Sequence, residues 1–298
     1  KINPVPMIIA IAVSSNLQGA ATLVGDTTSI LLGGYAGMDF MDFFFFLGRP
    51  SIFWAVELGA VLSCVVLLWL FRHESGRIET SARTQVSDYV PTILLASVVV
   101  LLIAASFIPG KPAVTNGLIC TGLMIVGLIY TAIRTHDTKK VIKPIREIDF
   151  ATLLLLFGLF VVIGGITEAG VIDAVAGIFV RLSADNVFLA YTLIVWASVL
   201  FSAFIDNIPY VATMLPVVQG MAGMMGIEPY VLYFGLLTGA TLGGNLTPVG
   251  ASANITAIGI LRKEGNEVKN RDFLRIGVPF TLTAVIAGYV FVWIFWGM

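Results

Sequence analysis

The sequence has few charged residues, and that scarcity decides the class of protein. Charged side chains make up 12% of the 298 residues and hydrophobic ones 58%, whereas soluble domains carry about 25% charged residues. So few charges cannot cover a protein surface in water, which excludes a soluble domain and indicates a membrane protein. The net charge of -1 also argues against nucleic acid as a partner.

Histidine and cysteine are scarce as well, with two of each. Cys64 and Cys120 lie in apolar runs, where packing is the expected role, and His73 and His136 fall in charged loops. The sequence has no cluster with metal-ligand spacing, no Gly-x-Ser-x-Gly motif and no P-loop. Because an enzyme would need a nucleophile with a base, or a metal cluster, we expect neither an enzyme nor a cofactor.

Long apolar runs, in contrast, are abundant. A run of about 18 residues crosses the hydrocarbon core as a helix. Runs 5–35 and 230–261 are long enough but are interrupted by glycine and polar residues, and run 187–225 is too long for one helix. We expect uninterrupted spans at residues 51–71, 89–108, 117–133, 150–167 and 274–296, with an amphipathic stretch at 171–182.

Basic residues predict which loops face the cytoplasm. If run 187–225 is a re-entrant hairpin, Lys1 and the loops 72–88, 134–149 and 262–275 share a side and hold 14 of the 17 basic residues. If that run crossed once, the five basic residues of 262–275 would change sides and the split would be 9 against 8. The positive-inside rule favours the hairpin and places these loops in the cytoplasm, beneath a plasma membrane. Such a hairpin must be buried in protein or line a cavity.

Two segments resemble each other at a shift of 225 positions. NPVPM…QGAATLVGDTTSILLGG, from Asn3, aligns with EPYVL…GGNLTPVGASANITAIG, from Glu228, through matched proline, glycine and hydroxyl positions. FFFFLGRP (43–50) further resembles DFLRIGVP (272–279) at a shift of 229. By the charge count the two copies cross in opposite directions, which is the inverted repeat of many secondary transporters.

The repeat predicts a division of the chain. We expect the end of a first repeat at 1–71, a cytoplasmic linker at 72–88, and a second repeat at 89–298 with three scaffold spans, a hairpin at about 187–225, a broken helix at 230–261 and a last span at 274–296. The second copy has residues 88 to 227 before its broken helix. We therefore expect about 140 residues, with three spans and a hairpin, ahead of Lys1.

Each interrupted run should expose polar groups at membrane depth. Carbonyls at the end of one half-helix and N–H groups at the start of the next lack partners, so a break offers oxygen ligands to a cation and donors to an anion. Asp26 and Asp206 are ionisable at that depth and are candidates for binding, with helix capping as the alternative. Asp26 aligns with Ala251, which predicts an asymmetric site.

These motifs resemble those of the ion transporter superfamily, which includes arsenite permeases, the melanosomal P protein, sodium/proton antiporters, and citrate and dicarboxylate carriers. SAFIDNIPYVATMLP followed by GATLGGNLTPVGASANITAIGI is similar to its second half, and SSNLQGAATLVGDTTSILLGG to its first-half motif SNxGGxATxIGDPPN. The resemblance covers the whole chain and is nearest to the arsenite permease and P protein branch. Gln18 departs from the first Gly of that motif, and Thr-Thr-Ser at 27–29 departs from Pro-Pro-Asn.

The resemblance implies an all-α integral membrane protein, an inverted-repeat secondary transporter with a re-entrant hairpin and broken helices, and a homodimer through scaffold helices. With Ser15 and Ser29 added from the first break itself, the substrate- or ion-binding residues are Ser15, Asn16, Thr22, Gly25, Asp26, Thr27, Ser29, Asp206, Asn207, Asn245, Thr247, Ser252 and Asn254. A possible Na+ site uses Asn16, Asp206, Asn207, Asn245 and Asn254.

The expected function is secondary active transport of a small anion or oxyanion, arsenite-like or a di- or tricarboxylate, coupled to H+ or Na+. A Na+/H+ antiporter that uses Asp206 or Asp26 is the alternative, and a membrane-embedded enzyme is a distant one. The expected partners are a small ion or anion and membrane lipid. Apart from Arg275, at the edge of the last predicted span, no Lys or Arg lies inside a predicted span, so helix termini, amides or a co-bound cation would have to balance an anion.

Overall fold

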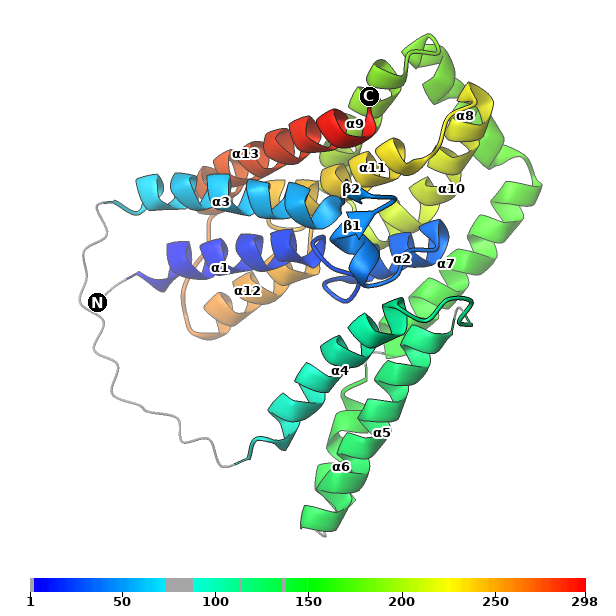
Figure 1. Ribbon diagram of the computed structural model, residues 1–298. Helices are drawn as coiled ribbons and strands as arrows, with labels where there is room; N and C mark the ends of the chain where they lie inside the picture. Colours follow the sequence, from blue (N-terminus) through cyan, green and yellow to red (C-terminus); the bar gives the residue numbers. More distant parts are fainter. Residues whose placement is uncertain (1–2, 73–87, 113, 136–137, 149) are drawn as a thin grey trace. The chain divides into compact units, whose positions relative to one another are not determined.

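A computed structural model describes residues 3–72, 88–112, 114–135, 138–148 and 150–298 (Figure 1). Lys1, His73, Arg77, Arg83 and His136, with most of the predicted linker 72–88, lie outside these residues. The chain groups into two compact units: unit 1 is Lys1–Met38, Asp42–Arg77 and Leu159–Met298, and unit 2 is Asp39–Met41 and Ile78–Gly158. These units describe contacts and not repeats, so the division at 1–71, 72–88 and 89–298 stays a prediction.

Helices dominate both units, as the sequence predicts for an all-α membrane protein. Unit 2 contains α4 (Val90–Ser106), α5 (Thr115–Thr135), α6 (Thr138–Arg146) and the first part of α7 (Phe150–Glu168). The rest of the helices, and one two-stranded sheet, belong to unit 1: α1 (Pro4–Gly19), α2 (Thr27–Ala36), most of η1 (Met41–Phe43), β1 (Phe45–Phe46), β2 (Arg49–Pro50), α3 (Ile52–Leu70), α8 (Val171–Ser183), α9 (Val187–Ser202), α10 (Asn207–Met225), α11 (Tyr230–Gly243), η2 (Gly244–Leu246), α12 (Ser252–Lys263) and α13 (Asn270–Trp296).

Both interrupted runs are broken helices, which confirms the two predicted breaks. α1 ends at Gly19 and α2 begins at Thr27; α11 with η2 ends at Leu246 and α12 begins at Ser252. The residues before α2 and α12 have nearly the same extended backbone, with φ -151° and ψ 163° at Asp26 and φ -148° and ψ 144° at Ala251. Thr27 and Ser252 are 225 positions apart, so the repeat seen in the sequence is also a repeat of backbone conformation.

The same glycine contact closes each break. A Cβ on Gly25 would lie 2.5 Å from the Gly19 carbonyl oxygen, and a Cβ on Gly250 would lie 2.6 Å from the Gly244 carbonyl oxygen. Both pairs are related by the shift of 225. Each break therefore brings the backbone of its two half-helices into contact, at a distance that only glycine allows.

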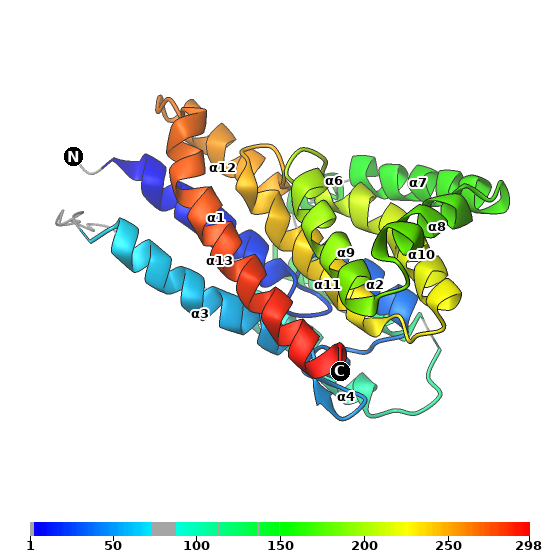
Figure 2. The ribbon, with the colours of Figure 1, turned by 90° about the horizontal axis from the view of Figure 1, so that it is seen from above.

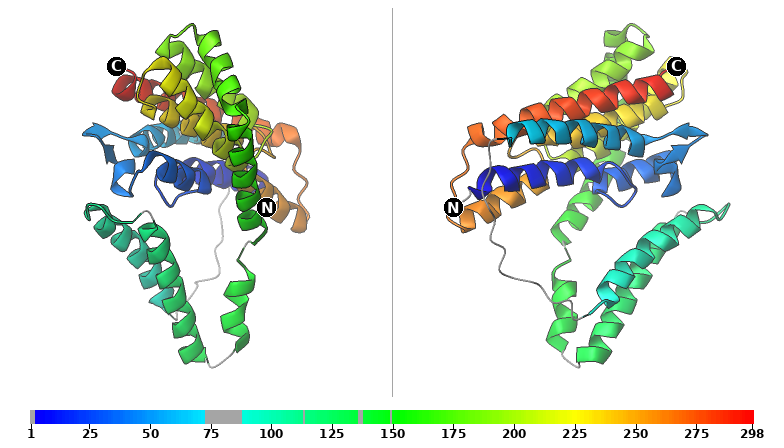
Figure 3. Two further views of the ribbon diagram at one scale, coloured as in Figure 1. Left: turned by 90° about the vertical axis from the view of Figure 1, so that its right-hand side faces the viewer. Right: turned by 60° about the vertical axis from the view of Figure 1, so that its left-hand side comes forward.

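The two copies run in opposite directions. α1 packs against α12, and α2 packs against α11, so the first half-helix of each copy lies beside a half-helix of the other (Figures 1 and 2). α13 covers both copies and lies along α3, where the Ser63 hydroxyl donates to the Phe280 carbonyl at 3.0 Å (Figure 3). At the centre, every residue of α11 from Val231 to Gly243 is buried.

The run 187–225 forms two helices, α9 and α10, that fold back on each other at Ala203–Asp206. Near this tip the hydroxyls of Ser198 and Tyr210 lie 3.1 Å apart. α9 seats on α11, because Gly235, Gly239 and Gly243 of α11 leave room for its backbone and side chains. The predicted hairpin is therefore present with one side buried against α11, while Leu200, Phe204 and Ile205 near its tip are exposed.

One end of unit 1 gathers regions that the charge count places on one side. A cavity of about 320 Å³ is lined by Asn3 at the start of α1, Phe71 at the end of α3, and Asn266 and Arg275 near the start of α13. This agrees with a shared side for the N-terminal residues, the end of α3 and the loop 262–275. The loop 134–149 belongs to unit 2, and its side stays a prediction.

The structure corrects three details. Residues 43–50 and 272–279 are not structural equivalents, because the first stretch ends in a β-hairpin whose turn, Leu47 and Gly48, has positive φ, while the second lies inside α13. The predicted loop 134–149 contains α6, a helix rich in basic residues. The last span begins at Asn270 rather than 274, because Asp272 accepts a hydrogen bond from the Lys269 N–H and caps the helix.

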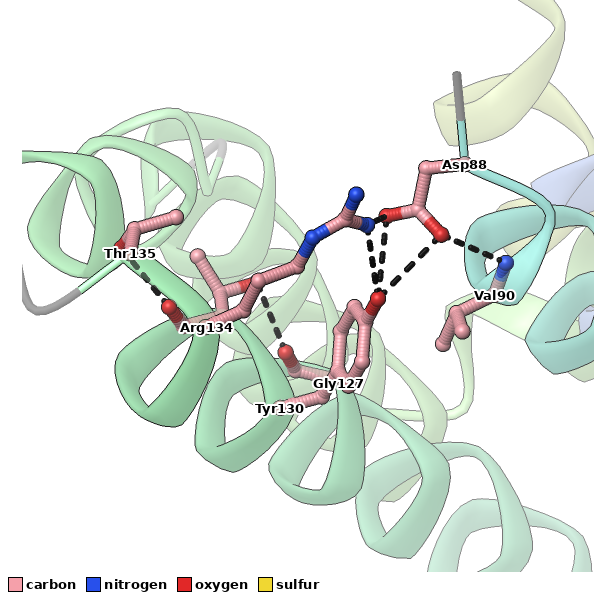
Figure 4. Close-up of polar contacts among 7 residues, drawn as sticks. Asp88, Val90, Gly127, Tyr130, Arg134 and Thr135 are labelled. Atoms are coloured by element: carbon pink, nitrogen blue, oxygen red, sulfur yellow. Dashed lines mark hydrogen bonds and ion pairs between the residues drawn. The ribbon is translucent and has the colours of Figure 1, made fainter. Parts of the chain in front are cut away.

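A polar cluster in unit 2 joins the start of α4 to the end of α5 (Figure 4). The Arg134 guanidinium pairs with the Asp88 carboxylate and donates to the Tyr130 hydroxyl at 2.7 Å. The Val90 N–H and the nearby Arg134 hold the pKa of the Asp88 carboxyl below its usual value. Elsewhere α4, α5 and α7 expose large apolar side chains, as lipid-facing or partner-facing helices do.

The glycine contacts give the first prediction. Gly250→Ala should destabilise the protein by about 1–3 kcal/mol, because its methyl group has no room beside the Gly244 carbonyl and the break must shift. Gly25→Ala should behave similarly. The matched control is Gly34→Ala in α2, where a Cβ would meet nothing within 4 Å. Thermal unfolding in detergent measures the difference, and equal stability of Gly250→Ala and Gly34→Ala would contradict the contact.

Candidate functional site

Three segments far apart in the sequence meet inside unit 1: the first break (20–26), the hairpin tip (203–206) and the second break (247–251). The Asn207 amide donates to the Asp26 carboxylate at 3.2 Å, which joins the start of α10 to the start of α2. The Thr247 hydroxyl donates to the Ala203 carbonyl, which joins the second break to the tip. Together these two contacts place the starts of helices from both copies around one region.

A pair of buried asparagines joins the two copies directly. The Asn16 amide donates to the Thr241 carbonyl at 2.7 Å and to the Asn245 side-chain oxygen at 3.1 Å. The Asn245 amide in turn donates to the Val13 carbonyl at 2.9 Å. Asn245 is fully buried and Asn16 is 9% exposed. These bonds satisfy polar groups that would otherwise be costly to bury.

Both candidate carboxylates cap helices. Asp26 accepts from the Thr27 N–H at 2.7 Å and from the Thr28 hydroxyl at 3.1 Å, and Asp206 accepts from the Ile208 N–H at 3.2 Å. The capping role weighed from the sequence is thus present at both positions. An ionised carboxylate has about four acceptor sites, so capping leaves each of these half-buried groups able to accept further bonds.

Asn254 is a polar side chain of the second break with an unused hydrogen-bond acceptor. Its amide donates to the carbonyls of Gly244 and Thr247, both at 3.1 Å. Its side-chain oxygen is buried and has no hydrogen-bond partner among the described residues. In the first copy the Ser29 hydroxyl makes the equivalent bond to the Gly19 carbonyl at 2.9 Å. Serine thus keeps the structural bond of the break, while only asparagine adds a free amide oxygen.

The three helix starts also differ in their caps. α2 and α10 begin at aspartates whose side chains cap them. α12 begins after Ala251 and has no side-chain cap. Its first N–H groups and the positive end of its helix dipole therefore remain available to an anion or to water.

The predicted residues fall into three groups. Hydrogen bonds link Asn16, Asp26, Thr27, Asn207, Asn245, Thr247 and Asn254 into the region described above, and Asp206 caps α10 beside them. Ser29 is buried within the first break. Ser15, Gly25 and Ser252 are exposed, and Thr22 is half-buried.

Ser15 lies on an open face of α1. Ser15 corresponds to Ala240, which is buried under α9 and whose carbonyl accepts from the Ser202 hydroxyl at 2.6 Å. Among the described residues, no helix covers that face of α1 as α9 covers α11. A cavity of about 530 Å³, lined by Ala10 and Ser14 among others, opens there instead. Ser15 is therefore not brought into the site by this part of the chain.

Sequence reasoning missed Thr241 and passed over Thr28 as a site residue. Their hydroxyls lie 3.0 Å apart, and both side chains are fully buried. A signal for Thr241 was present, since it stands 225 positions after Asn16 and is its counterpart in the repeat. The sequence carried no signal for the carbonyls of Val13 and Ala203, because a backbone carbonyl can accept a hydrogen bond whatever the side chain is.

Comparison with known proteins now identifies the family. The sequence profile of the CitMHS family, described as citrate transporter, matches residues 1–239. The chain belongs to the citrate transporter family. A 46 kDa membrane protein of Mycobacterium leprae is 30% identical over 98% of this chain, and an uncharacterised transporter of Mycobacterium tuberculosis is 31% identical over 98%. The human P protein is 30% identical over 65% of this chain and 23% of its own length.

Membership of the citrate transporter family confirms an integral, multi-pass membrane protein. It is a transporter rather than an enzyme, because the family and the Mycobacterium tuberculosis relative are both described as transporters. A solved transporter, YdaH of Alcanivorax borkumensis, matches with a TM-score of 0.61 and 15% identity, over 90% of this chain and 65% of its own. That match shows a shared fold. The chain spans about two thirds of these proteins, 68% of each mycobacterial relative and 65% of the solved transporter.

The asparagine pair gives the second prediction. Asn16→Ala should lower the free energy of unfolding by about 1–3 kcal/mol, because the Asn245 side-chain oxygen and the Thr241 carbonyl lose a buried donor. Ser15→Ala, at the exposed neighbouring position, is the matched control and should change stability by less than about 0.5 kcal/mol. If thermal unfolding shows equal losses for the two variants, the buried bonds do not join the copies as described.

Proposed function

We propose that the protein is a secondary active transporter that moves a small anion or oxyanion, arsenite-like or a di- or tricarboxylate, coupled to Na+ or H+. One observation carries this proposal: the two helix breaks and the hairpin tip meet through side-chain hydrogen bonds at Asp26, Asn207 and Thr247. Helix breaks buried at membrane depth cost backbone hydrogen bonds, and transporters use them to bind substrate and coupling ions.

The oxygen atoms of the second break support Na+ as the coupling ion. The side-chain oxygen of Asn254 is buried and unpaired among the described residues, while the nitrogen of the same amide holds the carbonyls of Gly244 and Thr247 in place. Carbonyl and amide oxygens are suitable ligands for hard cations. Of the predicted set Asn16, Asp206, Asn207, Asn245 and Asn254, we assign Asn254 the main role, because Asn16 and Asn245 are engaged with each other.

Charge balance favours a cation that binds together with the anion. The proposed site contains the carboxylates Asp26 and Asp206 and no lysine or arginine. An anion placed beside them would be repelled unless a positive group offset the charge. The uncapped start of α12 supplies a partial positive charge, and a bound Na+ or a proton on a carboxylate would supply the rest.

A homodimer through the scaffold helices belongs to the same proposal. α4, α5 and α7 expose large apolar side chains, including Leu95, Leu118 and Leu154, which are 65–70% exposed. Exposed apolar surface of this extent is covered by lipid or by a partner. A second copy on these helices would cover part of it.

Na+/H+ antiport is the second candidate. The half-buried carboxylates Asp26 and Asp206 stand at helix starts in the region where the segments meet. A carboxylate that binds either a proton or Na+ is the group that such exchange requires. In that case ion movement would need no anion.

Flux into proteoliposomes tests the function. We expect uptake of citrate, succinate or arsenite that is driven by an inward Na+ gradient or by a pH gradient. Sodium-driven proton movement with no anion uptake would favour the antiporter and contradict anion transport. Asn254→Ala should raise the Na+ concentration needed for half-maximal uptake about tenfold, because it removes one of a few ligands; a tenfold change corresponds to about 1.4 kcal/mol of binding free energy.

Thr256→Ala is the matched control for that variant, since Thr256 is an exposed residue two positions further along α12. It should leave the Na+ dependence unchanged. If the Na+ dependence is unaltered in both variants, Asn254 is not a ligand of the coupling ion. The proposal of anion transport would still stand in that case.

A further inference from the structure

A pocket at the C-terminal end of α13 lies outside the proposed transport site. Its volume is about 430 Å³, and it is lined by Leu47, Arg49, Glu228, Tyr230, Val231 and Trp296. Trp296 lies 21 residues after Arg275 in α13, so at 1.5 Å per residue the pocket lies about 32 Å along the helix from Arg275. That separation places it at the opposite surface of a membrane about 30 Å thick.

Aromatic side chains indicate that the pocket lies at the level of lipid headgroups. The Trp296 ring stacks on Phe46 and meets Tyr230 edge-on, with centroids 5.9 and 6.0 Å away. Trp296 also donates its indole N–H to the Pro50 carbonyl at 2.9 Å. Tryptophan and tyrosine gather at the membrane–water interface, where one part of the ring meets lipid and a polar atom meets water.

The β1–β2 turn carries an apolar side chain outward beside this pocket. Leu47 is 67% exposed and has a φ of 49°, in the left-handed region where asparagine or glycine is favoured in two-residue hairpins. Phe45, two residues earlier, is 55% exposed. A strained position is thus occupied by leucine, and its exposed side chain is suited to contact with lipid.

Two opposite charges line the pocket. The Arg49 guanidinium lies 5.7 Å from the Trp296 ring centroid and donates one N–H to the Phe295 carbonyl at 3.0 Å. Arginine has five N–H donors, so others remain for an acceptor in the pocket. Glu228 forms no ion pair in the described part of the chain. The pocket therefore offers a fixed cationic donor group and a carboxylate that are not paired with each other.

We propose that this pocket binds the headgroup of a phosphatidylethanolamine of the surrounding bilayer. Arg49 would receive the phosphate, since the planar guanidinium matches two phosphate oxygens. Glu228 would accept hydrogen bonds from the primary ammonium. Phosphatidylcholine has the same phosphate but no N–H donors on its nitrogen, and phosphatidylglycerol has no cationic group, so Glu228 is the residue that selects among them.

A lipid in this position would hold the transport unit at the membrane surface. Glu228 immediately precedes Pro229, the N-cap of α11, which leads to the second break. Arg49 fixes the β-hairpin to the last turn of α13. One headgroup would therefore link the start of α11 to the end of α13, and both helices contact the candidate site.

Native mass spectrometry of the purified protein, with the three lipids at equal concentration and matched acyl chains, tests the proposal. We expect phosphatidylethanolamine to be retained at least about fivefold over phosphatidylcholine, a ratio of the size that the net contribution of one ordinary hydrogen bond gives. Glu228→Gln should reduce that ratio to about one without weakening phosphatidylglycerol binding. Glu264→Gln, at the end of α12, is the matched control and should keep the preference.

Other outcomes overturn the proposal. Equal retention of the three lipids by the unaltered protein, or a preference that survives in Glu228→Gln, would remove Glu228 as the selecting group. Arg49→Gln should weaken retention of all three lipids, and no loss there would remove the phosphate contact. Glycerophosphoethanolamine, the free headgroup, should compete only weakly; competition as strong as that of the lipid would show that the bilayer is not the source.

Discussion

The structure depends on how the carbonyls of the helix breaks are satisfied where water is scarce. In both copies the carbonyl of the last glycine before the break, Gly19 or Gly244, accepts from a side chain of the next half-helix, Ser29 or Asn254. The glycines at 25 and 250 let the two half-helices touch at that carbonyl. Because each break carries its own donor, it can persist inside the membrane without unfolding the helices on either side.

This shared frame explains the difference between the copies. Ser29 and Asn254 make the same hydrogen bond to the carbonyl at the end of the first half-helix. Only Asn254 also retains a buried amide oxygen without a partner among the described residues. The first copy instead has Asp26, which caps α2 and accepts from Asn207 of the hairpin. The second break is thus supplied with neutral oxygens and an uncapped helix start, and the first with a carboxylate. Such a division suits an ion and a substrate bound at different places in one site.

The breaks, the hairpin and the repeat could be predicted from the sequence, because asparagine and proline among clustered glycines do not suit an unbroken spanning helix. The same motifs predicted that Asn16, Asn207 and Asn245 belong together. The bond between Asn16 and Asn245 could not be predicted, because that pairing depends on the direction in which two helices cross. The predicted equivalence of residues 43–50 with residues 272–279 was wrong. The similarity of the two sequences did not indicate that Leu47 would adopt a positive φ in a turn.

We propose that the first break and the hairpin tip act as one site, and the Asn207–Asp26 hydrogen bond links them directly. A double-mutant cycle on transport rate measures that link, with Asp26→Asn, which keeps a capping side chain, and Asn207→Ala. A shared site predicts that each substitution slows transport and that the double variant is scarcely slower than the more impaired single variant. Losses that simply multiply would show that the two residues act independently and would contradict a shared site.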